Sequence, residues 1–471
     1  MRGDLLAEPV DGLDEALAAV DAVDRVLVAG LLRPQPAQVA DLALIAESVE
    51  GTPLAGRVAE AADKAAAGTA GPEHTVALAA ARIALLGAVH DAVTARVAAA
   101  TGTVAAGERL PPTRAEVEPV NLLEAACTWL ADLARSGWQG IDADLVAGAA
   151  PVVAAMLPDV THRRLATLLD GFAAELAASC PGSALSRIPA RRWADLWSRA
   201  MLLTRPGAAA VPATGVVSGR LLPLGVDLQE HPTAVQAQVH AVLEPVDGGE
   251  PRLVRASVST PKPETVVGAG VWQLLRPHLS LLGAAGAGRS VEITDMPITA
   301  EGDLIWQDAN ARPGAAADPF VTARVVLPTA TTVEVAPLDR HPARIAVPVF
   351  LDGYTIDDGA TGGAPDDAPT VSFVVAGQPI RVDVDRIPSA SPLTSEAVAA
   401  STACIALLRW DAGSFVLQPL AVETAVKRKT VAVHADAWAA GTTDKVGAKA
   451  EKAATAAVEA LRERAGKLLR A

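Results

Sequence analysis

Aromatic side chains are scarce in this sequence: its 471 residues include only five Phe and one Tyr, and aromatic residues make up 3% of the chain. Apolar residues make up 51%, so the chain has ample material for buried cores. Those cores must be packed mostly from Ala, Val and Leu. The scarcity also disfavours a nucleic-acid site of the kind in which bases stack on exposed aromatic rings.

Cysteine is nearly absent as well. The three cysteines, Cys127, Cys180 and Cys404, lie far apart, and none belongs to a Cys-x-x-Cys or Cys/His cluster. This spacing excludes a disulfide framework and the common zinc motifs. Arg far outnumbers Lys, and Ala and Gly are abundant, which is typical of a GC-rich bacterial genome. We therefore expect a reduced bacterial protein with buried thiols.

Long hydrophobic runs are missing from the sequence. The segment Leu145–Leu157 is too short to span a bilayer and contains Pro151. The first residues lack the basic start and the apolar stretch of a signal peptide. From these features we expect a cytoplasmic protein with no membrane partner.

Motifs for catalysis, cofactors and metals are missing too. The eight histidines include no pair at the i, i+4 spacing of a helical zinc site, and the chain has no Gly-x-Ser-x-Gly sequence. We therefore expect no catalytic residue, no metal ligand and no bound cofactor. An enzyme whose site is assembled from distant residues in the second half remains an alternative.

Three weaker patterns have ordinary structural interpretations. Gly283–Ser290 has the glycine spacing of a phosphate-binding loop, but Arg289 replaces the lysine and a strand-like segment follows where a helix is required. The aspartates between Asp352 and Asp367 match no calcium motif and favour a solvated loop. Asp383 and Asp385 are expected on an exposed strand face.

Hydrophobic spacing divides the chain into a helical and a strand-rich part. Residues 1–207 show repeated three- and four-residue spacing, which predicts an all-α domain, either a bundle or an irregular stack of helical hairpins. Residues 208–426 show short alternating segments joined by hairpins, which predicts antiparallel sheets, in one unit or in two (208–336 and 337–426). The first predicted strand begins at Val235, and later ones include Phe320–Leu327 and Thr331–Val335.

The remaining segment, 427–471, is basic in an acidic chain. It carries ten basic and five acidic residues, whereas the whole chain carries a net charge of −14. It is predicted to end in a basic amphipathic helix, and the fold class is α+β multidomain. The predicted apolar stripe of this helix consists of Val446, Ala450, Ala453, Ala457, Leu461, Ala465 and Leu468.

The basic segment supplies a candidate interaction surface. This surface could bind phosphates or an acidic protein face. The simpler interpretation is that the basic residues form the solvated face of a helix whose opposite face packs on the rest of the protein. The candidate residues are Lys427, Arg428, Lys429, Lys445, Lys449 and Lys452.

A tryptophan-rich helix, Pro189–Gly207, lies at the predicted boundary between the α and β parts. Trp193, Leu196 and Trp197 share its apolar face, so we expect them to pack inward, at the junction between the domains.

Taken together, these features favour a non-catalytic cytoplasmic adaptor or structural subunit that acts through protein–protein contacts. A nucleic-acid-binding module that uses the β-rich domain and the basic tail is the alternative.

Overall fold

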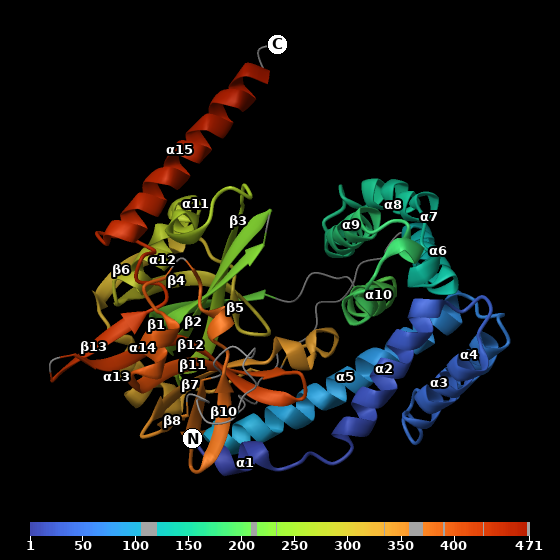
Figure 1. The fold of residues 1–471 in the computed structure, drawn as a ribbon, viewed down its shortest axis with the longest axis horizontal. Helices are drawn as coiled ribbons and strands as arrows, with labels where there is room; N and C mark the ends of the chain where they lie inside the picture. Colours follow the sequence, from blue (N-terminus) through green and yellow to red (C-terminus); the bar gives the residue numbers. More distant parts are fainter. Residues whose placement is uncertain are drawn as a thin grey trace.

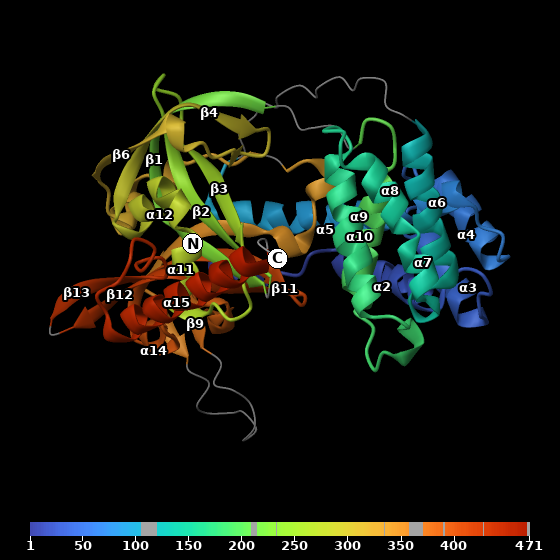
Figure 2. The ribbon, with the colours of Figure 1, turned by 90° about the horizontal axis from the view of Figure 1, so that it is seen from above.

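A computed structural model describes residues 1–104, 120–208, 214–231, 233–333, 335–357, 371–389, 391–426 and 428–468. It confirms the α+β class: a helical region over residues 3–203 is followed by mixed, mostly antiparallel sheets and a C-terminal helix. Figures 1 and 2 show the helical region on one side and the sheets on the other, and Figure 1 shows the last helix extending away from the sheets.

The helices of the first region follow the predicted spacing closely. The apolar run Leu145–Leu157 is divided between two helices, α7 and α8, and the side chain of Asp142 caps the first by accepting a hydrogen bond from the Leu145 backbone N–H at 2.8 Å. The helices are α1 (Gly3–Ala7), α2 (Leu13–Ala29), α3 (Pro36–Glu47), α4 (Ala55–Ala66), α5 (Pro72–Thr101), α6 (Val120–Ser136), α7 (Ala143–Ala147), α8 (Ala149–Met156), α9 (Arg163–Ala178) and α10 (Ala190–Leu203).

Helix α5 is the longest, and it links the helical region to the sheets. Its 30 residues have a mean hydropathy of 1.6 over the most apolar window, and half of that window is buried inside the protein. By length and composition it could cross a membrane, contrary to the expectation that no segment is long and apolar enough, but a buried core helix has the same length and composition. Figure 1 shows it passing from the helical region to the strands, so that it packs against both.

The first sheet closes into a barrel. Its strands pair in the order β1-β2-β3-β5-β4, and β4 pairs again with β1. The strands are β1 (Thr214–His231), β2 (Ala234–Pro245), β3 (Arg252–Pro261), β4 (Arg289–Thr299) and β5 (Asp303–Leu304), with β6 (Ala311–Ala316) added beside β4. The helices α11 (Val271–Leu274) and α12 (Leu279–Gly286) lie between β3 and β4 in the chain.

Strand β1 was not predicted, although it is the longest strand. It curves enough to pair with β4 through its first half and with β2 through its second half. Gly219 lies where both pairings overlap, and a Cβ atom there would approach the Glu244 carbonyl oxygen to 2.3 Å. Because glycine is needed for this close approach, the segment lacks the regular alternation by which strands are recognised.

The second sheet has the same strand order when β7 and β8 are taken as one strand interrupted at Gly353. Its order is β7-β11-β12-β10-β9-β8, with β13 paired to the far part of β12. The elements are β7 (Ala346–Asp352), β8 (Thr355–Asp357), β9 (Ser372–Val375), β10 (Gln378–Val382), α14 (Ser395–Ala399), β11 (Ser401–Asp411), β12 (Ser414–Val426) and β13 (Lys429–His434).

This order is that of the OB fold, a five-stranded barrel in which the third and fifth strands are parallel and a helix precedes the fourth. In the first barrel (β1–β5) the parallel pair is β3 with β5, and in the second barrel (β7–β12) it is β10 with β12. The other strand pairs in the two sheets are antiparallel, as the sequence predicts, and the two parallel pairs were not predicted. The protein therefore contains two barrels with the OB strand order.

Two predicted strands between the barrels were wrong. Phe320–Leu327 forms the helix α13 (Pro319–Val325), because Asp318 accepts a hydrogen bond from the Phe320 N–H at 2.8 Å and Pro319 occupies the first turn. Within its described residues, Thr331–Val335 forms isolated bridges at Thr331, which pairs with Arg252, and at Thr332, but no strand. The strand prediction for Phe320–Leu327 assumed a two-residue apolar spacing, whereas the cap at Asp318 begins a helix there.

The buried cores show how the parts are joined. The core of the helical region extends from Ala19 to Leu203, and the first barrel has a core of its own. The core of the second barrel includes Leu6 of α1 and Val97 and Ala100 of α5. Helices of the first region thus complete the second barrel, and the predicted domain boundaries at 207 and 426 stay predictions.

The C-terminal helix α15 (Lys445–Leu468) contacts the body near its beginning. Ala454 packs so closely on Gly270 that a Cβ atom at Gly270 would lie 2.3 Å from the Cβ of Ala454. The predicted stripe was wrong at two positions, because Val446 is 74% exposed and Ala453 is also exposed, whereas Gly447 and Ala454 are buried. The packed face is therefore rotated about one residue along the helix.

Candidate functional site

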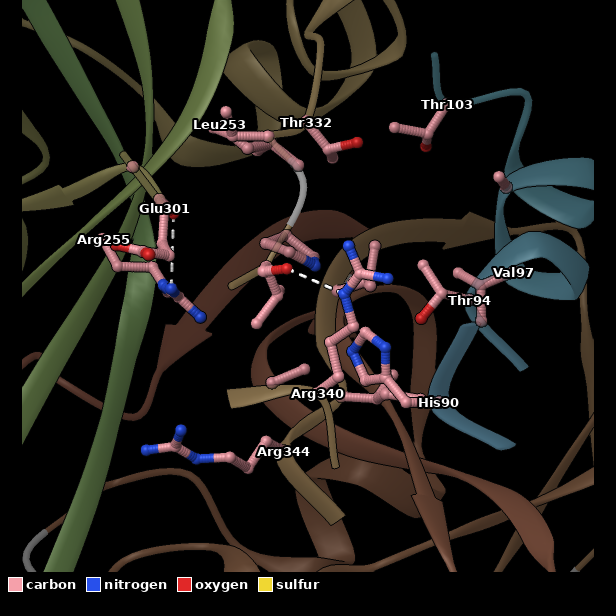
Figure 3. Close-up of a pocket in the computed structure, with 18 of the residues that line it drawn as sticks. His90, Thr94, Val97, Thr103, Leu253, Arg255, Glu301, Thr332, Arg340 and Arg344 are labelled. Carbon is pink, nitrogen blue, oxygen red and sulfur yellow. Dashed lines mark hydrogen bonds between the residues drawn. The ribbon is translucent and has the colours of Figure 1, made fainter. Parts of the chain in front are cut away.

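A pocket of about 480 Å³ lies where the helical region, the first barrel and the segment between the barrels meet. Helix α5 forms one wall, strands β2 and β3 with the β4–β5 turn form another, and residues 332–348 supply the rest. Figure 3 shows this arrangement, with Thr94 and Val97 on α5 facing Arg255 on the barrel, and Arg340 and Arg344 coming from the connecting segment. Its volume lies within the range of small-molecule sites.

Three arginines line this pocket, each with a carboxylate partner. Arg255 binds Asp303 through two nitrogens, at 2.8 and 3.0 Å, and Arg340 binds Asp91 at 2.6 Å. Arg340 also donates to the Val335 carbonyl oxygen at 2.9 Å, which holds its side chain within the pocket. Because these guanidinium groups are held by several bonds, they are ordered before any ligand arrives.

The third arginine, Arg344, shares its partner with two others. The carboxylate of Asp339 contacts Arg344, Arg199 and Arg164. Burial alone would raise the pKa of Asp339, but Arg199, Arg344 and Arg164 outweigh burial and lower it. One negative charge thus faces three positive charges, so this edge of the pocket is electropositive.

The same segment is fixed to the helical region. Leu338 packs against the helical core, and His341 lies 3.3 Å from the carboxylate of Asp195. Asp195 in turn binds Arg82, which is almost completely buried and also pairs with Asp24. The charged residues of the connecting segment are therefore continuous with a buried ion-pair network in the helical bundle.

Two residues that line the pocket each carry a buried polar atom with no hydrogen-bond partner among the described residues: His240, through Nε2, and Thr94, through Oγ1. His240 is 1% exposed, although it lies on the outer face of β2. Burial lowers the pKa of His240 to about 3. The charge of Asp227 acts to raise this pKa, whereas the charges of Arg255 and Arg409 lower it further. His240 is therefore a neutral imidazole near pH 7.

Behind His240, a buried polar network joins the two barrels. Arg409 of β11 donates to Asp227 of β1 at 2.8 Å, and Gln418 of β12 donates to the other oxygen of the same carboxylate at 2.8 Å. Arg409 also donates to Gln418 at 2.6 Å. All three side chains are buried, so this network fixes the first barrel against the second.

In the predicted strand that begins at Val235, polar and apolar residues alternate, and Gln236, Gln238 and His240 lie on the outer face of β2 because Val239 and Ala241 belong to the barrel core. The pocket was not assigned from the sequence. The pocket residues come from segments more than 200 positions apart. The only sequence feature that could have indicated the pocket is a histidine and an arginine on the outer faces of neighbouring strands, and this feature alone suggests an ordinary exposed surface.

The candidate interaction surface is divided between two elements. Arg428 and Lys429 are exposed at the β12–β13 hairpin, and Lys427 lies outside the described residues. Lys445, Lys449 and Lys452 are exposed on α15. Figure 1 shows the hairpin and the helix as separate projections, so the structure does not merge them into one continuous strip.

Trp193 and Trp197 lie inside the core of the helical region, and Leu196 packs against that core. The Trp193 ring meets Trp138 edge to face with centroids 5.8 Å apart, and Trp197 donates its indole N–H to the Leu130 carbonyl oxygen at 2.9 Å. These contacts are all made to helices of the same region.

The weaker sequence patterns have structural roles. Within Gly283–Ser290, α12 ends at Gly286 and β4 begins at Arg289, which is a helix followed by a strand, the reverse of a phosphate-binding loop. Asp383 was wrongly placed on an exposed strand face: it is 8% exposed, follows the end of β10 and pairs with Arg386 at 2.9 Å.

The acidic segment Asp352–Asp367 lies partly outside the described residues. Within the parts of the chain that the structure describes, no group of three or more His, Cys, Asp or Glu side chains is arranged to hold a metal ion.

Comparisons with known proteins give no relative: no protein-family model, no curated protein and no solved structure matches this chain.

Proposed function

We propose that the protein is a non-catalytic adaptor or structural subunit of a protein assembly, and that α15 is the arm by which it holds a partner protein. The observation that carries this proposal is the extension of α15 away from the body (Figure 1). Its first half is packed through Ala454 on Gly270, whereas Arg462, Arg464 and Lys467 near its end are exposed. A helix of 24 residues is about 36 Å long, which is long enough to reach well beyond the barrel.

The charge of this helix indicates the kind of partner. Residues 445–468 carry six basic and three acidic side chains, in a chain whose net charge is −14. An acidic partner surface would be attracted to α15 and repelled by most of the remaining chain, which directs the partner to the helix. We therefore propose an acidic protein surface as the partner of α15.

Charge reversal on the helix tests the proposal. The triple variant Arg462→Glu, Arg464→Glu, Lys467→Glu changes only exposed side chains, so we expect its melting temperature to stay within about 2 °C of wild type, since surface substitutions shift stability by about 0.5 kcal/mol or less. We expect the variant to lose the protein that wild type retains on an affinity column from its native lysate at low salt.

The matched control reverses Arg57 and Lys64, which are exposed on α4 far from α15 in the fold. This control should retain the partner. If light scattering shows a lone monomer and wild type, variant and control retain the same proteins, α15 is not a docking arm and the proposal is wrong.

Nucleic-acid binding is a second candidate, favoured by one observation: both barrels have the OB strand order, and OB folds bind oligonucleotides on their second and third strands. In the first barrel this face carries Arg255 and His240, and α5 lies across it. The hairpin residues Arg428 and Lys429 would supply phosphate contacts.

Fluorescence anisotropy with a labelled oligothymidylate of about 30 nucleotides tests this candidate, since each OB barrel occupies about 4–16 nucleotides. Binding should weaken steeply with salt, and the triple variant Lys427→Ala, Arg428→Ala, Lys429→Ala should flatten that salt dependence. Absence of binding at 50 mM salt would eliminate the candidate.

A further inference from the structure

The pocket beside α5 contains buried polar atoms that the protein itself does not pair. His240 Nε2 and Thr94 Oγ1 lie on opposite walls, one on the barrel and one on the helix, and neither has a partner among the described residues. Buried nitrogen and oxygen atoms are almost always hydrogen-bonded, because leaving one unpaired costs free energy. The two atoms therefore leave one hydrogen-bonding position unfilled on each wall.

The charges around the pocket indicate the sign of that group. Arg255 uses Nε and Nη2 to bind Asp303, and its Nη1 takes no part in those bonds. Arg344 shares the single carboxylate of Asp339 with Arg164 and Arg199, which leaves excess positive charge at its edge. Planar guanidinium groups suit carboxylate and phosphate oxygens, which they can bind through two parallel hydrogen bonds.

The remaining lining combines polar side chains, which include the carboxylates of Asp91 and Glu301, with a larger apolar part. Val97 and Ala98 of α5 face Leu253 and Val254 of β3, and Val347 with Pro348 closes the end near the second barrel. Figure 3 shows Val97 and Leu253 on opposite sides of the space. A volume of about 480 Å³ exceeds what an inorganic ion needs and lies within the range of organic ligands.

We propose that this pocket binds a small organic anion, whose phosphate or carboxylate group is held by Arg255, Arg340 and Arg344 and whose uncharged body lies between α5 and β3. The neutral His240 imidazole and the Thr94 hydroxyl hydrogen-bond that body. Because the pocket walls come from the helical region and from the first barrel, the bound anion links the two. The proposal is independent of the docking role of α15.

Two matched fluorescent probes separate an anion site from a merely apolar cavity. The first is 8-anilinonaphthalene-1-sulfonate, an organic anion, and the second is N-phenyl-1-naphthylamine, which has the same rings without the sulfonate. Both fluoresce when they enter an apolar site. We expect the anion to saturate one site per chain and to bind at least about tenfold more tightly than the neutral probe, a difference that one charge-assisted hydrogen bond supplies.

Two pairs of variants locate the binding. Ala98→Phe fills the pocket from α5 and should abolish saturable binding of the anionic probe, whereas Ala99→Phe, on the exposed side of the same turn, should leave it unchanged. Arg255→Gln should weaken the anionic probe about tenfold or more and leave the neutral probe unchanged. Its control is Arg220→Gln, which removes a comparable arginine paired with Glu244 on the same barrel, outside the pocket.

Competition identifies the anionic group. Displacement of the probe by adenosine monophosphate indicates a phosphate ester, and displacement by octanoate indicates a carboxylate; either result supports the proposal. Failure of both to displace it would overturn the assignment of these two groups. The proposal is also wrong if the wild-type protein does not bind the anionic probe saturably, or if Ala98→Phe binds it normally. It is equally wrong if both probes bind equally well and Arg255→Gln changes the binding of neither, because the cavity would then be merely apolar.

Discussion

The two barrels share a strand order but differ in what completes their cores. The core of the first barrel is closed by its own helices α11 and α12, with Trp272 and Leu281 inside. The core of the second barrel is completed from outside by Leu6 of α1 and by Val97 and Ala100 of α5. The first barrel is therefore closed mainly by its own helices, although a further core cluster packs Leu224 of β1 with Ile405 of β11, whereas the second barrel is built together with the helical region.

Gly3 shows how closely α1 belongs to the second barrel. A Cβ atom at this position would lie 2.3 Å from the carbonyl oxygen of Val375 in β9. The N-terminal helix thus lies directly on a strand that follows it by some 370 residues. Barrels with the same strand order can therefore be completed by their own helices or by helices from a distant part of the chain.

The largest expected effect tests this difference in the second barrel. Phe373 is completely buried in the shared core, so Phe373→Ala should destabilise the protein by about 3–5 kcal/mol. Because α1 and α5 share that core, the second barrel and the helical region should melt in one transition. Circular dichroism at a helical wavelength and tryptophan fluorescence measure that transition.

The matched change in the first barrel is Leu221→Ala, also completely buried. It should lower the stability of that barrel by about 2–5 kcal/mol while the helical signal melts at a higher temperature. If the helical signal is lost early in both variants, the two barrels are equally integrated and the comparison fails.

A slightly smaller effect is expected where the two barrels meet. Arg409→Met removes the cation that pairs with Asp227, and a buried carboxylate left unpaired costs about 3 kcal/mol. The double variant Asp227→Asn, Arg409→Met no longer buries a charge and should recover more than half of that loss in urea titrations. A double variant no more stable than the single one would mean that the pair does not control the interface.

The smallest of these effects appears only in acid. The pKa of His240 falls from an ordinary value of 6.5 to about 3 in the folded protein, so below pH 6.5 the unfolded chain binds a proton that the folded one does not. Stability should therefore fall as the pH decreases from 6.5 towards 3, by about 2 kcal/mol from this group at pH 5. Asp227, Arg255 and Arg409 are the charged groups that act on it.

His240→Gln has no such proton and should show a shallower loss of stability between pH 7 and pH 5 in urea titrations at fixed pH. Equal slopes for wild type and variant would show that His240 is not buried as a neutral group. The same measurement on His231→Gln, an exposed histidine of the same barrel, serves as the control.

Much of the helical region could be predicted from the sequence, since helix spacing is a local property. The apolar positions of α2, α5 and α10 recur within one or two turns, and the caps and proline breaks that end them lie beside them. Hairpins such as β11–β12 were predicted for the same reason, because both strands and the turn at Gly413 are contiguous.

The candidate site was beyond such reasoning. Nothing near Arg255 in the chain indicates that Thr94 of α5 lies across a pocket from it, and nothing near His240 shows that Arg409 of the other barrel acts on it. The alternation of β2 correctly placed His240 on the outer face, but exposure of that face depends on which distant elements pack on it.

By itself, the sequence determined the order of helices and strands, the two classes of region and the basic charge of the last helix, because each depends on residues within a few turns or one hairpin. Only the tertiary structure decided that both sheets close into barrels, through the parallel pairs β3–β5 and β10–β12, and that α1 and α5 complete the second of them. The apolar pattern of a helix or strand shows which of its faces is buried. Which other segment packs on that face depends on contacts between parts that are far apart in the chain.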